Sequence, residues 1–153
     1  MRNIIFILTI TCLFACKKTA PQPDADPSAE FDTYIRGEWN VVEIKEVFLV
    51  ESGHQVGQIV YYTPPVYIFT AGKIEVPTGF NTLNYTYQFS FENELKYMSI
   101  TYNAGITDTY KIMEQSDNKI VLHAYWDVPM YPNEYNEKVK KRVSIVLERK
   151  IKR

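Results

Sequence analysis

The residues best suited to acid–base or metal chemistry lie close together at His123, Tyr125 and Asp127. In an extended strand, residues two apart point to the same face, so these side chains would share one face. The other histidine, His54, lies far earlier in the chain. A solvent-facing strand is the simpler interpretation of this spacing. The chain also has no phosphate loop, serine-nucleophile motif, zinc spacing or calcium loop. We therefore expect no catalytic residue, no metal, no cofactor and no enzymatic activity.

The charge and cysteine content exclude several further classes of function. A formal net charge of −1 gives no indication of nucleic-acid binding. Lysine and arginine are concentrated in residues 137–153, which we interpret as a solvated outer strand face; the alternative is a surface for an acidic partner or anionic lipid. Cys12 and Cys16 are the only cysteines, so residues 17–153 can contain no disulfide, thiolate metal site or nucleophilic thiol.

Residues 1–15 have the pattern of a signal peptide. A short positive segment precedes the uncharged run 4–14, which is too short to span a bilayer. The run ends in Leu-Phe-Ala-Cys, which resembles the bacterial lipobox, in which the cysteine, here Cys16, is acylated and becomes residue one. Cys12 fits less well because threonines occupy the corresponding positions before it. An ordinary secretory signal with an incidental cysteine is the alternative.

The lipobox resemblance implies a lipoprotein that is held in the lipid bilayer through Cys16. Palmitate-type acyl chains give stable anchoring when two or more are present. Residues 16–26 are polar and proline-rich, so we expect them to form a flexible tether. Lys17 favours the outer membrane of the cell envelope, because an aspartate at this position retains lipoproteins in the inner membrane of Gram-negative systems. Whether the protein faces the periplasm or the cell surface stays open.

Residues 27–153 are expected to form one all-β domain that begins with a short helix. Asp26 is suited to cap a helix over 27–36, Pro27 to begin it and Gly37 to stop it. Apolar residues then alternate with polar ones, most clearly in 83–91. The expected strands are 38–50, 56–70, 73–76, 83–91, 95–102, 107–115, 119–127 and 138–150.

The number of strands decides the architecture. The prolines at 64 and 65 either divide 56–70 into two strands, which makes nine, or mark a bend in one strand, which makes eight. We favour eight, because an even number lets the first and last strands pair and close an antiparallel up-and-down barrel. The helix then shares the closed end with the tight turns, and the longer connections share the open end. These connections are 51–55, 77–82, 103–106 and 128–137.

This order of elements resembles the lipocalin-like domain of lipoproteins from Bacteroidetes-type bacteria, a calycin-like β-barrel. The resemblance covers 31–153 and rests on Gly37-Glu-Trp39 at the head of the first strand and on the helix before it. It also rests on the meander 66–74, on Tyr110-Lys-Ile112 and on the Leu147-Glu-Arg149 ending. It implies that Trp39 packs at the closed base against Arg149, a cation–π contact of ~1 kcal/mol. The domain is shorter than a typical lipocalin and has no helical lid after its first strand, so its cavity is either small or filled.

The aromatic residues are the candidates for ligand binding. An eight-stranded barrel either is filled by its side chains or holds one small ligand. We expect a non-catalytic protein that binds a small apolar or amphiphilic ligand in the barrel mouth. The alternative is an interaction module of an envelope complex, with a filled barrel and contacts through its loops. Inward-facing strand residues and open-end loop residues make up the candidate set: Tyr85, Tyr87, Phe89, Trp126, Met130, Tyr131 and Tyr135. The alternative is plain core packing for the strand residues and self-packing of the long loop for the loop residues.

Overall fold

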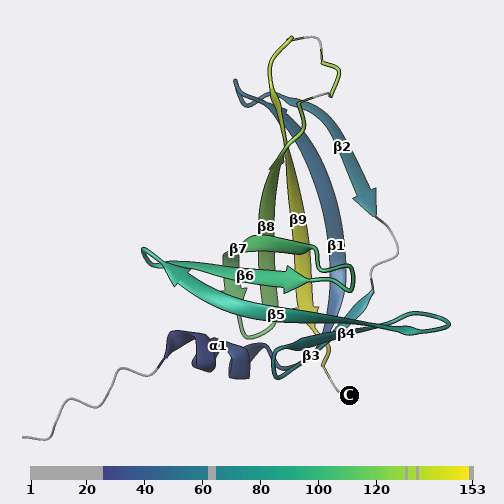
Figure 1. The fold of residues 1–153 in the computed structure, drawn as a ribbon, viewed down its shortest axis with the longest axis vertical. Helices are drawn as coiled ribbons and strands as arrows, with labels where there is room; N and C mark the ends of the chain where they lie inside the picture. Colours follow the sequence, from purple (N-terminus) through teal and green to yellow (C-terminus); the bar gives the residue numbers. More distant parts are fainter. Residues whose placement is uncertain (1–25, 62–64, 130, 134, 152–153) are drawn as a thin grey trace, which may run out of the picture.

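The computed structural model describes residues 26–61, 65–129, 131–133 and 135–151. Within these ranges the chain forms one helix followed by nine strand segments, all antiparallel to their neighbours (Figure 1). The elements are α1 (Pro27–Ile35), β1 (Gly37–Val50), β2 (Gln55–Tyr61), β3 (Val66–Thr70), β4 (Lys73–Pro77), β5 (Thr82–Glu92), β6 (Leu95–Thr101), β7 (Thr107–Ser116), β8 (Lys119–Asp127) and β9 (Val139–Arg149). The predicted signal peptide, Cys16 and most of the tether lie outside the described residues.

The sheet closes into a barrel because the first strand pairs with the last. β1 pairs with β9 from Trp39 opposite Arg149 to Val50 opposite Val139. Along its other edge, β1 pairs first with β3 and then with β2. β2 and β3 therefore share one place in the wall, and the nine segments make a closed barrel of eight strands. The prediction of an all-β, eight-stranded antiparallel barrel with a short N-terminal helix is confirmed.

The lower part of the barrel is filled by inward-pointing side chains. Alternation along each strand turns apolar residues to the inside, as on β8, where Ile120, Leu122 and Ala124 are buried. On β5, the predicted alternation buries Tyr87 and leaves its neighbours Thr86 and Gln88 exposed. The main core draws on most elements, and its largest fully buried members are Ile35, Trp39, Phe69, Ile74, Met98, Ile100, Ile120, Leu122 and Leu147.

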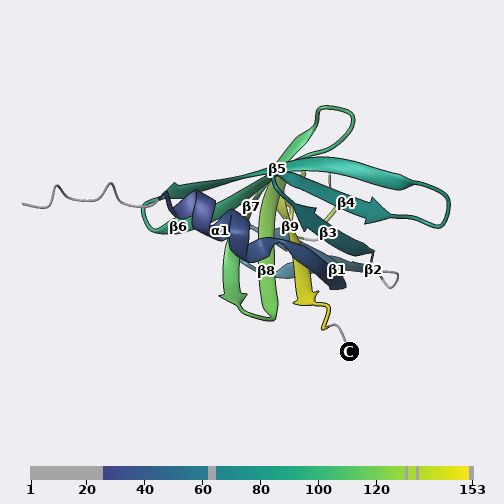
Figure 2. The same ribbon diagram turned by 90° about the horizontal axis from the view of Figure 1, so that it is seen from below.

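Helix α1 lies across the lower end of the barrel, as the view from below shows (Figure 2). The side chain of Asp26 accepts a hydrogen bond of 2.9 Å from the backbone N–H of Ser28, which is the predicted N-cap. Phe31 is buried, with its ring edge-to-face against Phe89 at 4.4 Å between centroids. The Tyr34 hydroxyl donates to the Ser116 carbonyl, so the helix shares this end with the tight turn after β7. Within the described ranges, no helix has the length and apolar character of a membrane span.

The upper part of the molecule is an extension of the barrel wall. β1, β2, β8 and β9 rise above the other strands, of which β3, β4, β5 and β6 run across the molecule below them (Figure 1). Their connections meet at the top, where the Ser52 backbone N–H donates to Glu137 at 2.8 Å. A second apolar cluster of Phe48, Val50 and Val139 lies here. Of the four predicted open-end connections, those after β1 and β8 therefore reach furthest above the barrel (Figure 1).

Candidate functional site

A cleft of about 580 Å³ lies above the packed core, at the mouth of the barrel. This volume is typical of a pocket for a small molecule. The strand period of two explains its walls, because the residues that fill the core lower down each strand continue upward to line the cleft. Five aromatic and four aliphatic side chains form most of the lining: Tyr61, Tyr67, Tyr102, Tyr110, Trp126, Ile44, Val128, Val143 and Ile145.

Three of these tyrosines supply neutral hydroxyl groups. The Tyr102 and Tyr110 hydroxyls are hydrogen-bonded to each other at 3.0 Å. Burial raises the pKa of Tyr67, Tyr102 and Tyr110 above the ordinary tyrosine value, and the neighbouring tyrosine hydroxyls raise the pKa of Tyr67 and Tyr110 further. These groups therefore stay protonated at physiological pH. They can orient a polar group of a ligand by donating or accepting a hydrogen bond.

An ion pair interrupts the apolar wall on the side of β1 and β9. The Lys141 ammonium lies 3.4 Å from a Glu46 carboxylate oxygen and 5.1 Å from the centroid of the Trp126 ring. Both charged side chains are largely withdrawn from solvent, with 28% of Lys141 and 16% of Glu46 exposed. Asp108 lines the cleft from β7, beside Tyr102, whose pKa its carboxylate helps to raise. Asp127 lies exposed at the rim.

The predicted ligand-binding residues of β5 and β8 lie at different heights in the barrel. Trp126 lines the cleft. Tyr85 packs edge-on behind Tyr102, with 4.8 Å between ring centroids. Tyr87 and Phe89 belong to the packed core near the base, because the Tyr87 hydroxyl bonds to Asp32 of the helix and the Phe89 ring packs edge-on against Phe31. Periodicity identified the face of each residue but could not give its height.

The predicted binding residues Tyr131 and Tyr135, in the loop after β8, pack against β1 and the connection that follows it. Tyr131 stacks on Phe48 at 4.4 Å between centroids. Tyr135 stacks on His54 at 5.3 Å, with the two rings nearly parallel. Met130 lies outside the described residues. The two rings therefore hold this loop against β1 and the connection after it, while Tyr135 stays 41% exposed.

Sequence reasoning missed the polar half of the cleft. Tyr67, Tyr102 and Tyr110 come from strands whose local pattern does not distinguish core from mouth. Lys141 was detectable, because the other inward positions of β9 from Val139 to Leu147 are apolar and a charge among them breaks the alternation. Glu46 breaks the pattern of β1 in the same way.

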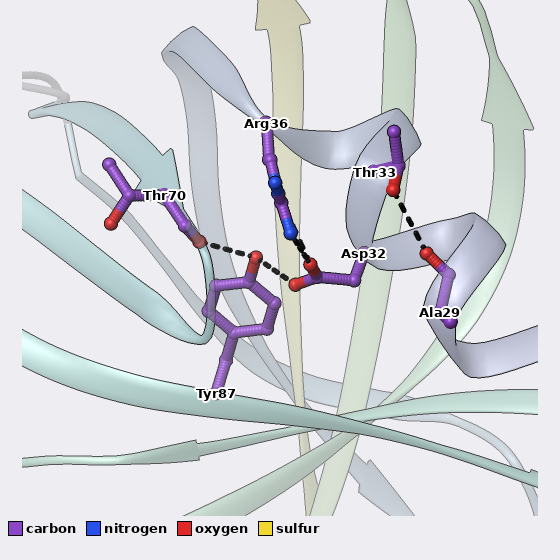
Figure 3. Close-up of polar contacts among 6 residues, drawn as sticks. All are labelled: Ala29, Asp32, Thr33, Arg36, Thr70 and Tyr87. Carbon is purple, nitrogen blue, oxygen red and sulfur yellow. Dashed lines mark hydrogen bonds and ion pairs between the residues drawn. The ribbon is translucent and has the colours of Figure 1, made fainter.

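A separate network of polar side chains lies at the base, where it joins the helix to the barrel (Figure 3). The Tyr87 hydroxyl lies 2.6 Å from Asp32 and 2.7 Å from the carbonyl oxygen of Thr70, and Arg36 donates to the same carboxylate. Burial alone would raise the pKa of Asp32, but the hydrogen bonds from Tyr87 and Arg36 outweigh it and lower that pKa. Each of these polar groups has a partner within the fold, so we assign the network a structural role.

The group of His123, Tyr125 and Asp127, which the sequence suggested for acid–base or metal chemistry, lies on the outer face of β8. His123 is half-buried there and pairs in register with Lys111 and Ser144, while Tyr125 and Asp127 are exposed. Burial, together with the Arg142 charge, lowers the pKa of His123. His54 lies at the top against Tyr135. Among the described residues, no three histidine, cysteine or acidic side chains are arranged to hold a metal ion.

Trp39 and Arg149 meet at the closed end of the barrel. Trp39 is fully buried, and its ring N–H donates to the Ile35 carbonyl at 2.6 Å. The Arg149 guanidinium lies 4.4 Å from the centroid of the Trp39 ring. This is the arrangement that the lipocalin-like resemblance implied, and it lies at the opposite end from the cleft.

Fold and site together define a closed eight-stranded antiparallel barrel with a helix across its base and an aromatic cleft at its mouth. No protein-family model matches the chain, and no curated protein or solved structure matches it.

Proposed function

We propose that the protein is a lipid-anchored lipoprotein of the cell envelope that binds a small apolar or amphiphilic ligand without chemical conversion. The cleft carries this proposal, because about 580 Å³ of space is bounded mostly by aromatic and aliphatic side chains. The neutral tyrosine hydroxyls would orient a polar end of the ligand. A lipocalin-like relationship, which the Gly37-Glu-Trp39 motif and the order of elements favour, would account for a binding site at this end of the barrel.

The envelope location is supported by the leader. The lipobox-like Leu-Phe-Ala-Cys16 and the polar tether after it would hold the barrel close to a membrane, and Lys17 favours the outer one. A protein in that position could receive an amphiphilic molecule from the bilayer or from the surrounding medium.

Native mass spectrometry of the full chain, purified in a non-ionic detergent, tests ligand binding. Val143 faces the cleft, so Val143→Phe should fill part of it, whereas Val146→Phe adds the same bulk on the opposite face of β9. We expect a small molecule to co-purify with the native protein and with Val146→Phe, and to be lost from Val143→Phe. An adduct of equal occupancy in all three proteins, or in none, would contradict the proposal.

Interaction with another envelope protein is a second candidate, which the outer edge of β2 favours. β2 pairs with β1 along one edge, and no described strand pairs with its other edge. Its residues carry no charge, and Ile59 and Tyr61 are 45% and 46% exposed. An open, uncharged strand edge can accept a strand from another protein. A photo-crosslinking residue at Ile59 in intact membranes should trap one discrete protein, whereas the same residue at Thr86, on the inner strand β5, should trap none. Equal labelling from both positions would count against this candidate.

A further inference from the structure

We infer that the cleft selects ligands that carry a protonated amine or another organic cation on an apolar body. This inference rests on the proposed function, because it names the ligand class for the same cleft. It depends on how the charges inside the cleft are arranged around its aromatic rings.

Lys141 shows where a cation is stabilised in this cleft. Its ammonium lies 5.1 Å from the Trp126 centroid and 3.4 Å from a Glu46 carboxylate oxygen. An aromatic face and a carboxylate on either side of a nitrogen are the features by which proteins recognise organic cations. The protein's own lysine occupies this position, so it models the contacts that a ligand amine would make.

The charges of the cleft also favour a cation. Two carboxylates, Glu46 and Asp108, face one ammonium, that of Lys141. Lys141 pairs with Glu46, and Asp108 has no cationic partner within ion-pair distance among the described residues. At the rim, exposed Asp127 is the cross-strand neighbour of Lys140. A carboxylate without a cationic partner attracts a cationic ligand and repels an anionic one.

The surroundings of Asp108 fit an amine with an apolar body. Tyr102 and Tyr110 lie beside the carboxylate, and their neutral hydroxyls can accept hydrogen bonds from an ammonium group. The other walls are aromatic and aliphatic, and would contact the hydrocarbon part of the ligand. Lys141 would then compete with the ligand for Trp126 and Glu46, because all three lie in one cleft.

Calorimetric titration of the full chain, in a non-ionic detergent, with three probes of similar size tests this inference. The probes are 2-phenylethylammonium, neutral 2-phenylethanol and anionic 3-phenylpropionate. We expect the ammonium probe to bind at least about tenfold more tightly than the alcohol, and the carboxylate to bind most weakly. Asp108→Asn should weaken binding of the ammonium probe by about tenfold and leave binding of the alcohol unchanged.

Lys141→Met should have the opposite effect to Asp108→Asn on binding of the ammonium probe. Removal of the internal ammonium should strengthen binding of the ammonium probe about threefold to tenfold, because Trp126 and Glu46 become available. The Lys119–Glu114 pair is a matched control, since it joins the same residue types at 2.8 Å near the base. Lys119→Met and Glu114→Gln should leave all three affinities unchanged, and thermal unfolding confirms that each variant is folded.

The outcomes separate this inference from the proposed function. A preference for the ammonium probe, with opposite effects of Asp108→Asn and Lys141→Met, supports the inference. If the alcohol or the carboxylate binds as tightly as the amine, the cation inference is overturned while the proposed function stands. If no probe binds and no molecule co-purifies with the native protein, both are overturned.

Discussion

Arg149 shows how one side chain can join three parts of the barrel base. Its guanidinium donates hydrogen bonds to the carbonyl oxygens of Tyr34 at 2.7 Å, Arg36 at 3.3 Å and Asp117 at 2.9 Å. The same group lies over the ring of Trp39. The helix, the first strand and the turn before β8 therefore meet at one planar cation, whose shape and fixed donors suit that position.

Arg149→Lys should destabilise the fold although it keeps the charge. A lysine ammonium has no planar fork, so it cannot reach all three carbonyl oxygens and stack on Trp39 at once. We expect the free energy of unfolding to fall by about 1–3 kcal/mol, measured by urea denaturation. Lys150→Ala, which removes an exposed pair with Glu38, should cost under about 1 kcal/mol. Equal losses in the two variants would contradict this assignment.

Asp32 should make stability depend on pH in the acid range. Hydrogen bonds from Tyr87 and Arg36 outweigh the effect of burial and lower the pKa of Asp32 in the folded protein. Its contribution is therefore complete above the unfolded-state pKa of about 4 and is lost as the pH falls through the folded-state value. Asp32→Asn should lower stability at neutral pH and reduce the loss of stability below about pH 4.

Urea denaturation at several pH values measures this effect. Tyr87→Phe removes one hydrogen bond to Asp32 but keeps its charge, so it should give an intermediate dependence on pH. Identical pH profiles in the native protein and Asp32→Asn would show that Asp32 is not the source.

Among the elements, helix α1 has the clearest separate role, because it closes the base. It has nine residues, too few to be stable alone, so its contacts with the barrel must hold it in place. Its buried side chains are Phe31 and Ile35, and its polar side chains Asp32 and Tyr34 bond to the barrel. The helix thus forms with the barrel rather than before it.

Phe31→Ala should separate the helix from the barrel. The Phe31 ring is 3% exposed and packs against Phe89, so its removal leaves a cavity between the helix and β5. We expect a loss of about 3 kcal/mol or more in the free energy of unfolding. Backbone amides of α1 should also exchange with deuterium faster than those of β8. Glu30→Ala, on the exposed side of the helix, is the control and should have little effect on either measurement. Unchanged stability in Phe31→Ala would refute a packing role for this ring.

At the scale of the whole molecule, the barrel has a packed base and an open mouth at opposite ends. The helix, Trp39 and Arg149 close the lower end, whereas the cleft opens at the opposite end. The core and the site therefore do not compete for the same interior space. Substitutions in the cleft are expected to change binding with little effect on folding.

Cys16→Ser tests the proposed anchor of the whole protein. Without a thiol to acylate, the protein should move from the membrane fraction to the soluble fraction after cell lysis and centrifugation. Cys12→Ser is the matched control and should leave the protein in the membrane fraction. Membrane association that survives Cys16→Ser would contradict the lipoprotein proposal.

Local patterns in the sequence were sufficient for the class of fold. Strand periodicity after Gly37, the Asp26 cap and an even strand count together predicted a closed antiparallel barrel with a helix at one end. The cap and the periodicity depend on residues that are neighbours in the chain, and the strand count follows from the periodicity of successive segments. They act through backbone conformation and alternation, which the sequence records directly.

Only the tertiary structure decided where the site lies. Tyr87 and Trp126 have the same inward alternation, yet one bonds to Asp32 at the base and the other lines the cleft. Their heights depend on strand tilt and register, which arise from pairing between distant segments. The ion pair between Glu46 and Lys141 likewise depends on the pairing of β1 with β9 along almost their whole length. The sequence alone thus determined which faces turn inward, while closure of the barrel determined which inward residues meet around an open cleft.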